Sequence, residues 1–257
     1  MASLRHLSGL RALDRGALEQ WSRSPRGQRL LALEAREIAR VLPDVFGRHV
    51  LQVGSWDGDG SLIASAETLH RAVLGTVPGA RGAALVAPER LPLASKSVDA
   101  VLLPHTLEFS RSPHQVLREV DRVLNDRGRL FVLGFSPWSP WAWRTALGLR
   151  HRDFPAAAQF YGSRRVGDWL QLLDYDVVET RRFGVGFPWL APRSVGQPWS
   201  PGALLAPLAE AYLLVARKRV LPINFIGRTA RAQVRPLVGV GVPAAQRIRD
   251  GEPDTTG

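Results

Sequence analysis

The chain contains no cysteine among its 257 residues. This absence excludes a disulfide framework, a thiolate metal site and a cysteine nucleophile, and it is typical of an intracellular protein. Long apolar runs are lacking as well: the opening segment "MASLRHLSGLRALDRG" has no uninterrupted hydrophobic stretch, and "ALLAPLAEAYLLVA" is interrupted by Pro207 and Glu210. We therefore expect a soluble, cytoplasmic protein without a signal peptide or a membrane span.

Lysine is scarce, with Lys96 and Lys218 alone, so the formal net charge of +11 comes from arginine. Between Arg217 and Arg249 the chain carries many basic residues and no acidic one. Such a stretch binds RNA or acidic lipid headgroups by charge, or only keeps the protein soluble. No RNA-recognition motif accompanies it, so both alternatives stay open. The six histidines lack metal-ligand spacing, and we expect no metal site.

Apolar positions at helical spacing predict two clear helices. Ser24 and Pro25 suit the N-cap and first position of a leading helix, which a proline later ends. Further along, Ser112, Pro113 and Gln115 fit a capping box at the start of another helix. Its buried stripe is predicted at Val116, Leu117, Val120, Val123 and Leu124.

Five short apolar runs alternate with helix-like segments: "HVLQVG", "RAVLGT", "GAALVA", "VDAVLLP" and "GRLFVLGF". Apolar strands of this kind, separated by helices, indicate a parallel sheet that is covered on both faces. Two later runs, "YDVVETRRF" and "AYLLVARKR", follow each other without a helix and predict an antiparallel pair. The expected fold class is α/β, with a doubly wound, mainly parallel, seven-stranded sheet.

The predicted organisation has three parts. Residues 1–47 form an N-terminal helical segment, residues 48–216 the α/β domain, and residues 217–257 a basic, loosely ordered extension. A segment rich in tryptophan and proline, residues 136–162, is predicted to be an insertion or a lid within the domain.

The segment from Glu89 to Phe135 reads "ERLPLASKSVDAVLLPHTLEFSRSPHQVLREVDRVLNDRGRLFVLGF". It resembles the class I S-adenosylmethionine-dependent methyltransferases, particularly the small-molecule-type group with the pattern "LPF…SFDAV…HVLEH…REIxRVLKPGGRL". The matching positions are Asp99, Leu107, Glu108, Arg118, Glu119, Arg122, Val123, Leu124, Gly128 and Arg129. The resemblance implies a Rossmann-like methyltransferase fold with S-adenosylmethionine as the cofactor.

The resemblance further implies a cofactor loop in "VLQVGSWDGDG". The family has an acidic residue and then a G-x-G-x-G turn here, so that main-chain N–H groups meet the amino-acid end of the cofactor. In this chain Gln52 replaces the acid, and a tryptophan replaces the middle glycine, where it acts either as a cover over the ligand or as an obstruction. The cofactor-binding residues implied for the loop are Gly54, Ser55, Trp56, Asp57 and Gly58.

Other parts of the implied cofactor pocket also depart from the family. The second strand ends in Thr76 where an acid would take both ribose hydroxyls, and a threonine makes one such bond. An acid that commonly contacts adenine is replaced by Ala87, which leaves Glu89 as the nearest carboxylate. Several lost contacts would weaken binding by orders of magnitude unless the substitutes recover them. The remaining implied cofactor residues are Pro88, Leu103, Pro104 and His105.

His105 is the candidate catalytic residue, since it follows the fourth strand at the carboxyl edge of the sheet. It either orients the cofactor or accepts a proton from the acceptor, and a packing role is the alternative. Candidate substrate residues are Trp138, Trp141 and Tyr161, as an aromatic pocket or as a lid packed on the sheet. Five arginines lie near these aromatic residues in the sequence. They are candidates for holding an anionic substrate, and a solvated surface is the alternative: Arg144, Arg150, Arg152, Arg164 and Arg165.

Three functions are compatible with these features. The first is a methyltransferase that uses S-adenosylmethionine and acts on a small-molecule acceptor. The second is a binding or regulatory module that keeps the fold with a lapsed catalytic site. The third is a methyltransferase that acts on nucleic acid, guided by the basic extension.

Overall fold

The computed structural model describes residues 17–18, 20–45, 47–56, 61–76, 82–139, 142–143, 159–185, 194–195 and 209–219. Six of the predicted site residues lie outside these ranges, as does most of the predicted basic extension: Asp57, Gly58, Trp141, Arg144, Arg150 and Arg152. The division of the chain into three parts therefore stays a prediction.

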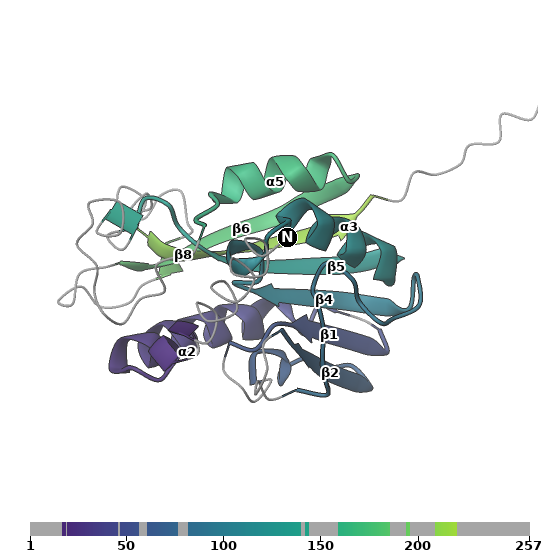
Figure 1. Ribbon diagram of the computed structural model, residues 1–257, viewed down its shortest axis with the longest axis horizontal. Coiled ribbons are helices and arrows are strands. Elements are labelled where there is room, and N and C mark those ends of the chain that lie inside the picture. Colours follow the sequence, from purple (N-terminus) through teal and green to yellow (C-terminus); the bar gives the residue numbers. More distant parts are fainter. Residues whose placement is uncertain are drawn as a thin grey trace, which may run out of the picture. The chain divides into compact units, whose positions relative to one another are not determined.

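The strands form one mixed sheet in the order β3-β2-β1-β4-β5-β8-β6-β7 (Figure 1). Their bounds are β1 His49–Val53, β2 His70–Gly75, β3 Ala84–Leu85, β4 Val98–Pro104, β5 Leu124–Phe135, β6 Tyr175–Val185, β7 Ser194–Val195 and β8 Ala209–Lys218. Strands β1 to β5 are parallel, and β8 inserts antiparallel between β5 and β6. The predicted mainly parallel α/β sheet with an antiparallel C-terminal pair is confirmed; the two-residue β7 makes eight strands in place of seven.

Two predicted helices are present, and their caps differ from each other. Helix α2 spans Pro25–Val41, and Ser24 Oγ accepts a hydrogen bond from the Gly27 amide at 3.1 Å, as an N-cap should. Helix α3 spans Pro113–Val123, but Ser112 makes no side-chain cap, so the predicted capping box is wrong. The backbone of Ser112, at φ −135° and ψ 74°, is not in the extended conformation that directs a cap hydroxyl at the first turn.

The other helical elements are short. Helix α5 spans Ser163–Gln171, and two 3₁₀ turns are η1 Ser61–Ile63 and η2 Leu107–Phe109. In the described ranges no helix combines the length and the apolar character that crossing a membrane requires.

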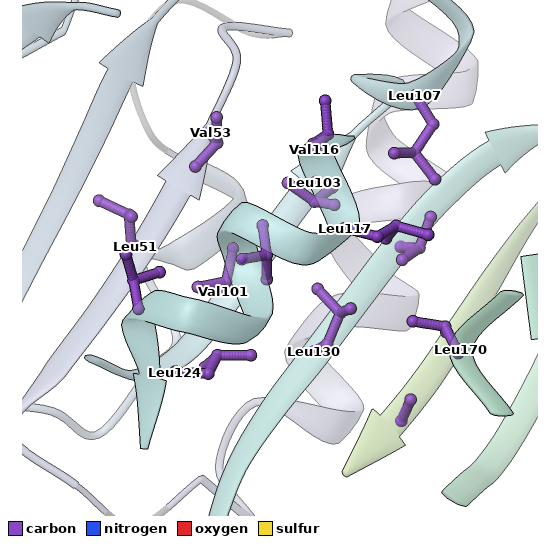
Figure 2. Packing of buried hydrophobic residues seen from close by; sticks show 14 of the residues in the cluster. Leu51, Val53, Val101, Leu103, Leu107, Val116, Leu117, Leu124, Leu130 and Leu170 are labelled. Atoms are coloured by element: carbon purple, nitrogen blue, oxygen red, sulfur yellow. The ribbon is translucent and has the colours of Figure 1, made fainter. Parts of the chain in front are cut away.

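Two apolar clusters cover the two faces of the sheet. On one face α3 and α5 pack on the strands, and Figure 2 shows Val116 and Leu117 of α3 lying over Leu103 and Leu130 of the sheet. The whole predicted stripe of α3 is buried, which confirms that prediction. The opposite face is covered by α2 and η1, together with Trp21 and Trp56. Between β1 and β2 the described residues contain a single 3₁₀ turn in place of a full crossover helix, so α2 reaches the carboxyl edge of the sheet.

Candidate functional site

The carboxyl ends of β1, β2 and β4 are tied together by hydrogen bonds. The Thr106 hydroxyl, just after β4, donates to the Val53 carbonyl at 2.5 Å, and the Gly54 amide donates to the Leu74 carbonyl at 2.8 Å. Gly54 has φ 103°, a conformation that glycine adopts readily and other residues rarely do. The glycine that the family places first in its loop is therefore required by the turn itself.

Trp56 is fully enclosed, with 1% of its surface exposed. Its indole stacks on Trp21 at 5.8 Å between ring centroids and lies 4.8 Å from the ring of His105. The indole N–H donates a short hydrogen bond to Glu34 Oε2. Trp56 is therefore a buried wall between the β1 loop, the β4 end and α2, and it is not a cover exposed to solvent.

His105 lies between two buried glutamates. Its Nε2 is 2.8 Å from Glu34 Oε1 on α2, and its Nδ1 is 3.4 Å from Glu108 Oε2 on η2. The other Glu108 oxygen accepts from the Phe135 amide at 2.5 Å, and the Phe135 ring stacks on His105 at 3.9 Å. The side chain of His105 is completely buried, and its backbone has the rare φ of 52°.

Electrostatics favour the charged form of this histidine. Burial alone would lower the pKa of His105, but the charges of Glu34 and Glu108 and the hydrogen bond with Glu34 outweigh it and raise the pKa to about 9. The contact of His105 Nδ1 with Glu108, at 3.4 Å, is an ion pair without hydrogen-bond geometry. The raised pKa favours the imidazolium form of the ring, which lies between Glu34 and Glu108. Such a group has no lone pair free to take a proton from an acceptor, so the geometry favours an orienting role.

Glu34 is the main site residue that the sequence analysis missed. It lies on the buried face of α2 beside Leu30, Ile38 and Val41, and none of its surface is exposed. A carboxylate at the i+4 position of an apolar helix stripe is costly to bury without a partner. That placement was the available signal, because it requires a donor from elsewhere in the chain.

The implied cofactor contacts on β1 and β2 are polar and partly unsatisfied. Gln52 is completely buried; its amide donates to the Gly54 carbonyl at 3.1 Å, while its Oε1 has no hydrogen-bond partner among the described residues. Thr76 Oγ1, directly after β2, is buried and likewise has no partner within the described ranges. Buried polar atoms of this kind are rare in folded proteins and are expected to meet a ligand or water. The neutral groups at this edge fit hydroxyl and amine groups of a nucleoside-type cofactor.

The remaining implied cofactor residues take up different positions. Ala87 and Arg90 close a tight turn after β3, and the Glu89 carboxylate accepts a hydrogen bond from the Ser110 hydroxyl at 2.5 Å. Leu103 points into the core with α3, so only its backbone is available at the sheet edge. Ser55 and Pro104 are buried beside Trp56 and His105 along the chain.

The candidate substrate residues are not brought into one aromatic cage. Trp138 is 61% exposed and lines a pocket of about 250 Å³ that follows β5. Tyr161 packs on Trp169 at 4.9 Å, and its hydroxyl bonds to Gln159. Arg165 lies over Tyr161 and Trp169, whereas Arg164 lines the pocket.

The fold and the carboxyl edge of its sheet are typical of α/β proteins that bind a nucleotide-like ligand. Comparison with known proteins gives the family. Residues 51–132 match the model of a methyltransferase domain. The uncharacterized protein YafS of Escherichia coli K12 is 30% identical over 229 residues, which cover 89% of this chain and 92% of YafS. The chain belongs to the class I S-adenosylmethionine-dependent methyltransferases, and S-adenosylmethionine is the cofactor of this family.

Other similarities are more distant. The ubiquinone/menaquinone biosynthesis C-methyltransferase UbiE of Rubrivivax gelatinosus is 29% identical over 163 residues, which cover 58% of this chain and 61% of UbiE. A methyltransferase structure from Thermotoga maritima has a TM-score of 0.56 at 15% identity, covering 79% of this chain and 99% of that one. That likeness extends to the fold alone.

Proposed function

We propose that this protein transfers a methyl group from S-adenosylmethionine to a small-molecule acceptor. The observation that carries the proposal is a pair of buried oxygens, Gln52 Oε1 and Thr76 Oγ1, at the carboxyl edge of β1 and β2, which have no hydrogen-bond partner in the part of the chain that the structure describes. In open α/β sheets this edge is where ligands bind. An unpaired buried oxygen is costly, and a ligand donor would remove that cost.

Several groups are suited to hold the cofactor at this edge. Thr76 suits a ribose hydroxyl, and Gln52 suits the ammonium of the amino-acid end. The Gly54 amide and carbonyl are already bonded to the Leu74 carbonyl and the Gln52 amide, so the turn at Gly54 shapes the edge. The turn at Ala87 to Glu89 borders the adenine side. Asp57 and Gly58 remain proposed members of the same loop.

When bound, S-adenosylmethionine supplies an electrophilic methyl group on a sulfonium. Transfer from a sulfonium depends mostly on positioning, so a dedicated base is not required. We assign His105 the role of a positioning residue, because its imidazolium joins Glu34 of α2 to Glu108 of η2 behind the cofactor edge. Trp56, held by the same Glu34, forms the inner wall of this edge.

A second function is favoured by one observation. Trp56 stands where the family has a glycine, and its ring is packed among Trp21, His105 and Phe135. A side chain so firmly enclosed is also what a lapsed cofactor loop would contain after a glycine was replaced. The alternative is therefore a binding module that has kept the fold and lost the transfer reaction.

Ligand-dependent thermal unfolding separates these two functions. Wild type with sub-millimolar S-adenosylmethionine or S-adenosylhomocysteine is expected to melt a few degrees higher than without ligand, by linkage of binding to folding. Thr76→Val removes the proposed ribose partner and is expected to weaken binding by about tenfold. Thr68→Val is the matched control, because Thr68 is a half-buried threonine just before β2, away from the carboxyl edge.

The results divide clearly. Stabilisation that Thr76→Val reduces and Thr68→Val leaves intact supports the methyltransferase. No stabilisation of the wild type by either nucleoside would favour the lapsed module.

A further inference from the structure

A pocket of about 250 Å³ lies beside the proposed cofactor edge. It is lined by Ser136, Pro137, Trp138, Gly162, Ser163, Arg164, Arg182 and Tyr212. Ser136 directly follows β5, and the preceding residue, Phe135, is the one that stacks on His105. The pocket is therefore one residue along the chain from the cluster behind the cofactor edge.

Strand pairing places side by side the residues of β5, β8 and β6 that lie at this pocket. Gly134 of β5 and Arg182 of β6 are both register partners of Tyr212 on β8, so the three residues form a row across the sheet. A Cβ on Gly134 would come within 2.5 Å of the Tyr212 ring, so glycine is required for that ring to lie over β5. The Tyr212 hydroxyl donates to the Tyr161 carbonyl at 2.9 Å, which fixes the ring.

Among the residues that the structure describes, neither guanidinium group in this pocket has an acidic partner. The Arg182 guanidinium donates to the Ser163 hydroxyl at 3.4 Å, and Arg164 lines the pocket with no carboxylate partner in the described ranges. The neighbouring Arg181, on the same strand as Arg182, pairs with both Glu37 and Glu179. Since unpaired arginines are suited to planar anions, the contrast points to a negatively charged ligand.

The other walls indicate what else the ligand carries. Helix α5 begins at Ser163 without a side-chain cap, so the first-turn N–H groups beside Arg164 add positive potential. Trp138 lines the pocket, is more than half exposed, and has the ring of Trp143 at 6.4 Å between centroids. An exposed indole beside two cations suits a flat, unsaturated group attached to the anion.

Size limits the ligand further. Pockets for drug-sized ligands measure roughly 300–1,000 Å³, and this one is smaller. It therefore suits the charged end of a small molecule better than a whole drug-sized ligand.

We propose that this pocket binds the carboxylate end of a small aromatic acceptor, held by Arg164 and Arg182 and stacked on Trp138. The assignment of this ligand as the methyl acceptor rests on the proposed function above. The binding of the anion does not, because every lining residue lies outside the proposed cofactor contacts.

A ligand-observed NMR titration of the full chain tests the proposal. The probes are 4-hydroxybenzoate, its neutral methyl ester and inorganic phosphate, each without added nucleoside. We expect 4-hydroxybenzoate to bind, and Arg164→Gln and Arg182→Gln each to weaken it by about tenfold. Arg165→Gln, which removes the same charge from the adjacent position on α5, is expected to change the affinity by less than about twofold.

The proposal would be overturned by equal binding of the methyl ester, by equal losses in Arg165→Gln and Arg164→Gln, or by no binding of 4-hydroxybenzoate at tens of millimolar. Tighter binding of phosphate than of 4-hydroxybenzoate would also overturn it, in favour of a phosphate site. If 4-hydroxybenzoate binds as expected but no nucleoside stabilises the protein, the anion site stands and only its role as the acceptor site falls.

Discussion

Glu34 is the side chain on which the buried polar cluster depends. One of its oxygens faces the imidazole of His105 and the other accepts from the indole of Trp56, and none of its surface meets solvent. Removing one partner of a buried ion pair leaves an uncompensated charge, which is more costly than losing an exposed pair.

Glu34→Gln is expected to lower the free energy of unfolding by about 3 kcal/mol, measured by urea denaturation at pH 7. Glu179→Gln is the control, because Glu179 is 38% exposed and pairs with Arg181 at 2.7 Å. That control is expected to cost about 1 kcal/mol or less. Similar losses in both variants would contradict the assigned importance of the Glu34 and His105 pair.

His105 gives stability a distinctive pH dependence. Its folded pKa of about 9 lies above its ordinary value of 6.5, so the folded state binds the proton more tightly than the unfolded chain. The contribution of this proton to the free energy of unfolding is fully present below about pH 6.5 and is lost as the pH rises through about 9. The groups that face the ring are Glu34 from α2, Glu108 from η2, and the rings of Trp56 and Phe135.

His105→Asn removes the charge while tolerating the positive φ of 52°. The free energy of unfolding is expected to be higher for wild type than for this variant at pH 6. In urea denaturation that difference is expected to fall by about 3 kcal/mol between pH 6 and pH 9.5. If the difference in free energy of unfolding stays constant or grows with pH, His105 is not held as an imidazolium.

At the scale of single elements, the two N-caps make a direct comparison. Ser24 Oγ accepts from the Gly27 amide and caps α2, whereas the Ser112 side chain makes no cap on α3. Ser24→Ala is expected to cost about 1 kcal/mol of stability, and Ser112→Ala less than about 0.5 kcal/mol, in the same denaturation measurement. If Ser112→Ala lowers the free energy of unfolding as much as Ser24→Ala does, Ser112 caps α3 after all and the predicted capping box is right.

Helices and strands with a strong local sequence pattern were predictable. The hydrogen bonds and connections at their ends were not. The apolar run at residues 98–104 and the stripe of α3 became β4 and a buried helix face as predicted. The capping box failed because the sequence contains the residue types but not the backbone angles of Ser112. The 3₁₀ turn η1 after β1, the helical element in the described part of that connection, was also not predicted, since the alternation of strands with helix-like segments indicates a full helix there.

At the scale of the whole molecule, the family resemblance predicted the sheet but not the composition of the site. Gln52 and Thr76 were recognised as replacements, because each occupies a fixed place at the end of a strand. Glu34 was not, because it reaches His105 from 71 positions away in the sequence. Contacts across such distances depend on how α2 packs, which local periodicity does not encode.

The most direct test of the central claim is to locate the cofactor on the chain by ultraviolet crosslinking of methyl-labelled S-adenosylmethionine, followed by peptide mapping. The account predicts label in peptides that contain the carboxyl ends of β1, β2 or β4, and loss of that label when S-adenosylhomocysteine competes. Label confined to other parts of the chain, or label that the competitor leaves unchanged, would contradict a methyltransferase site at this edge.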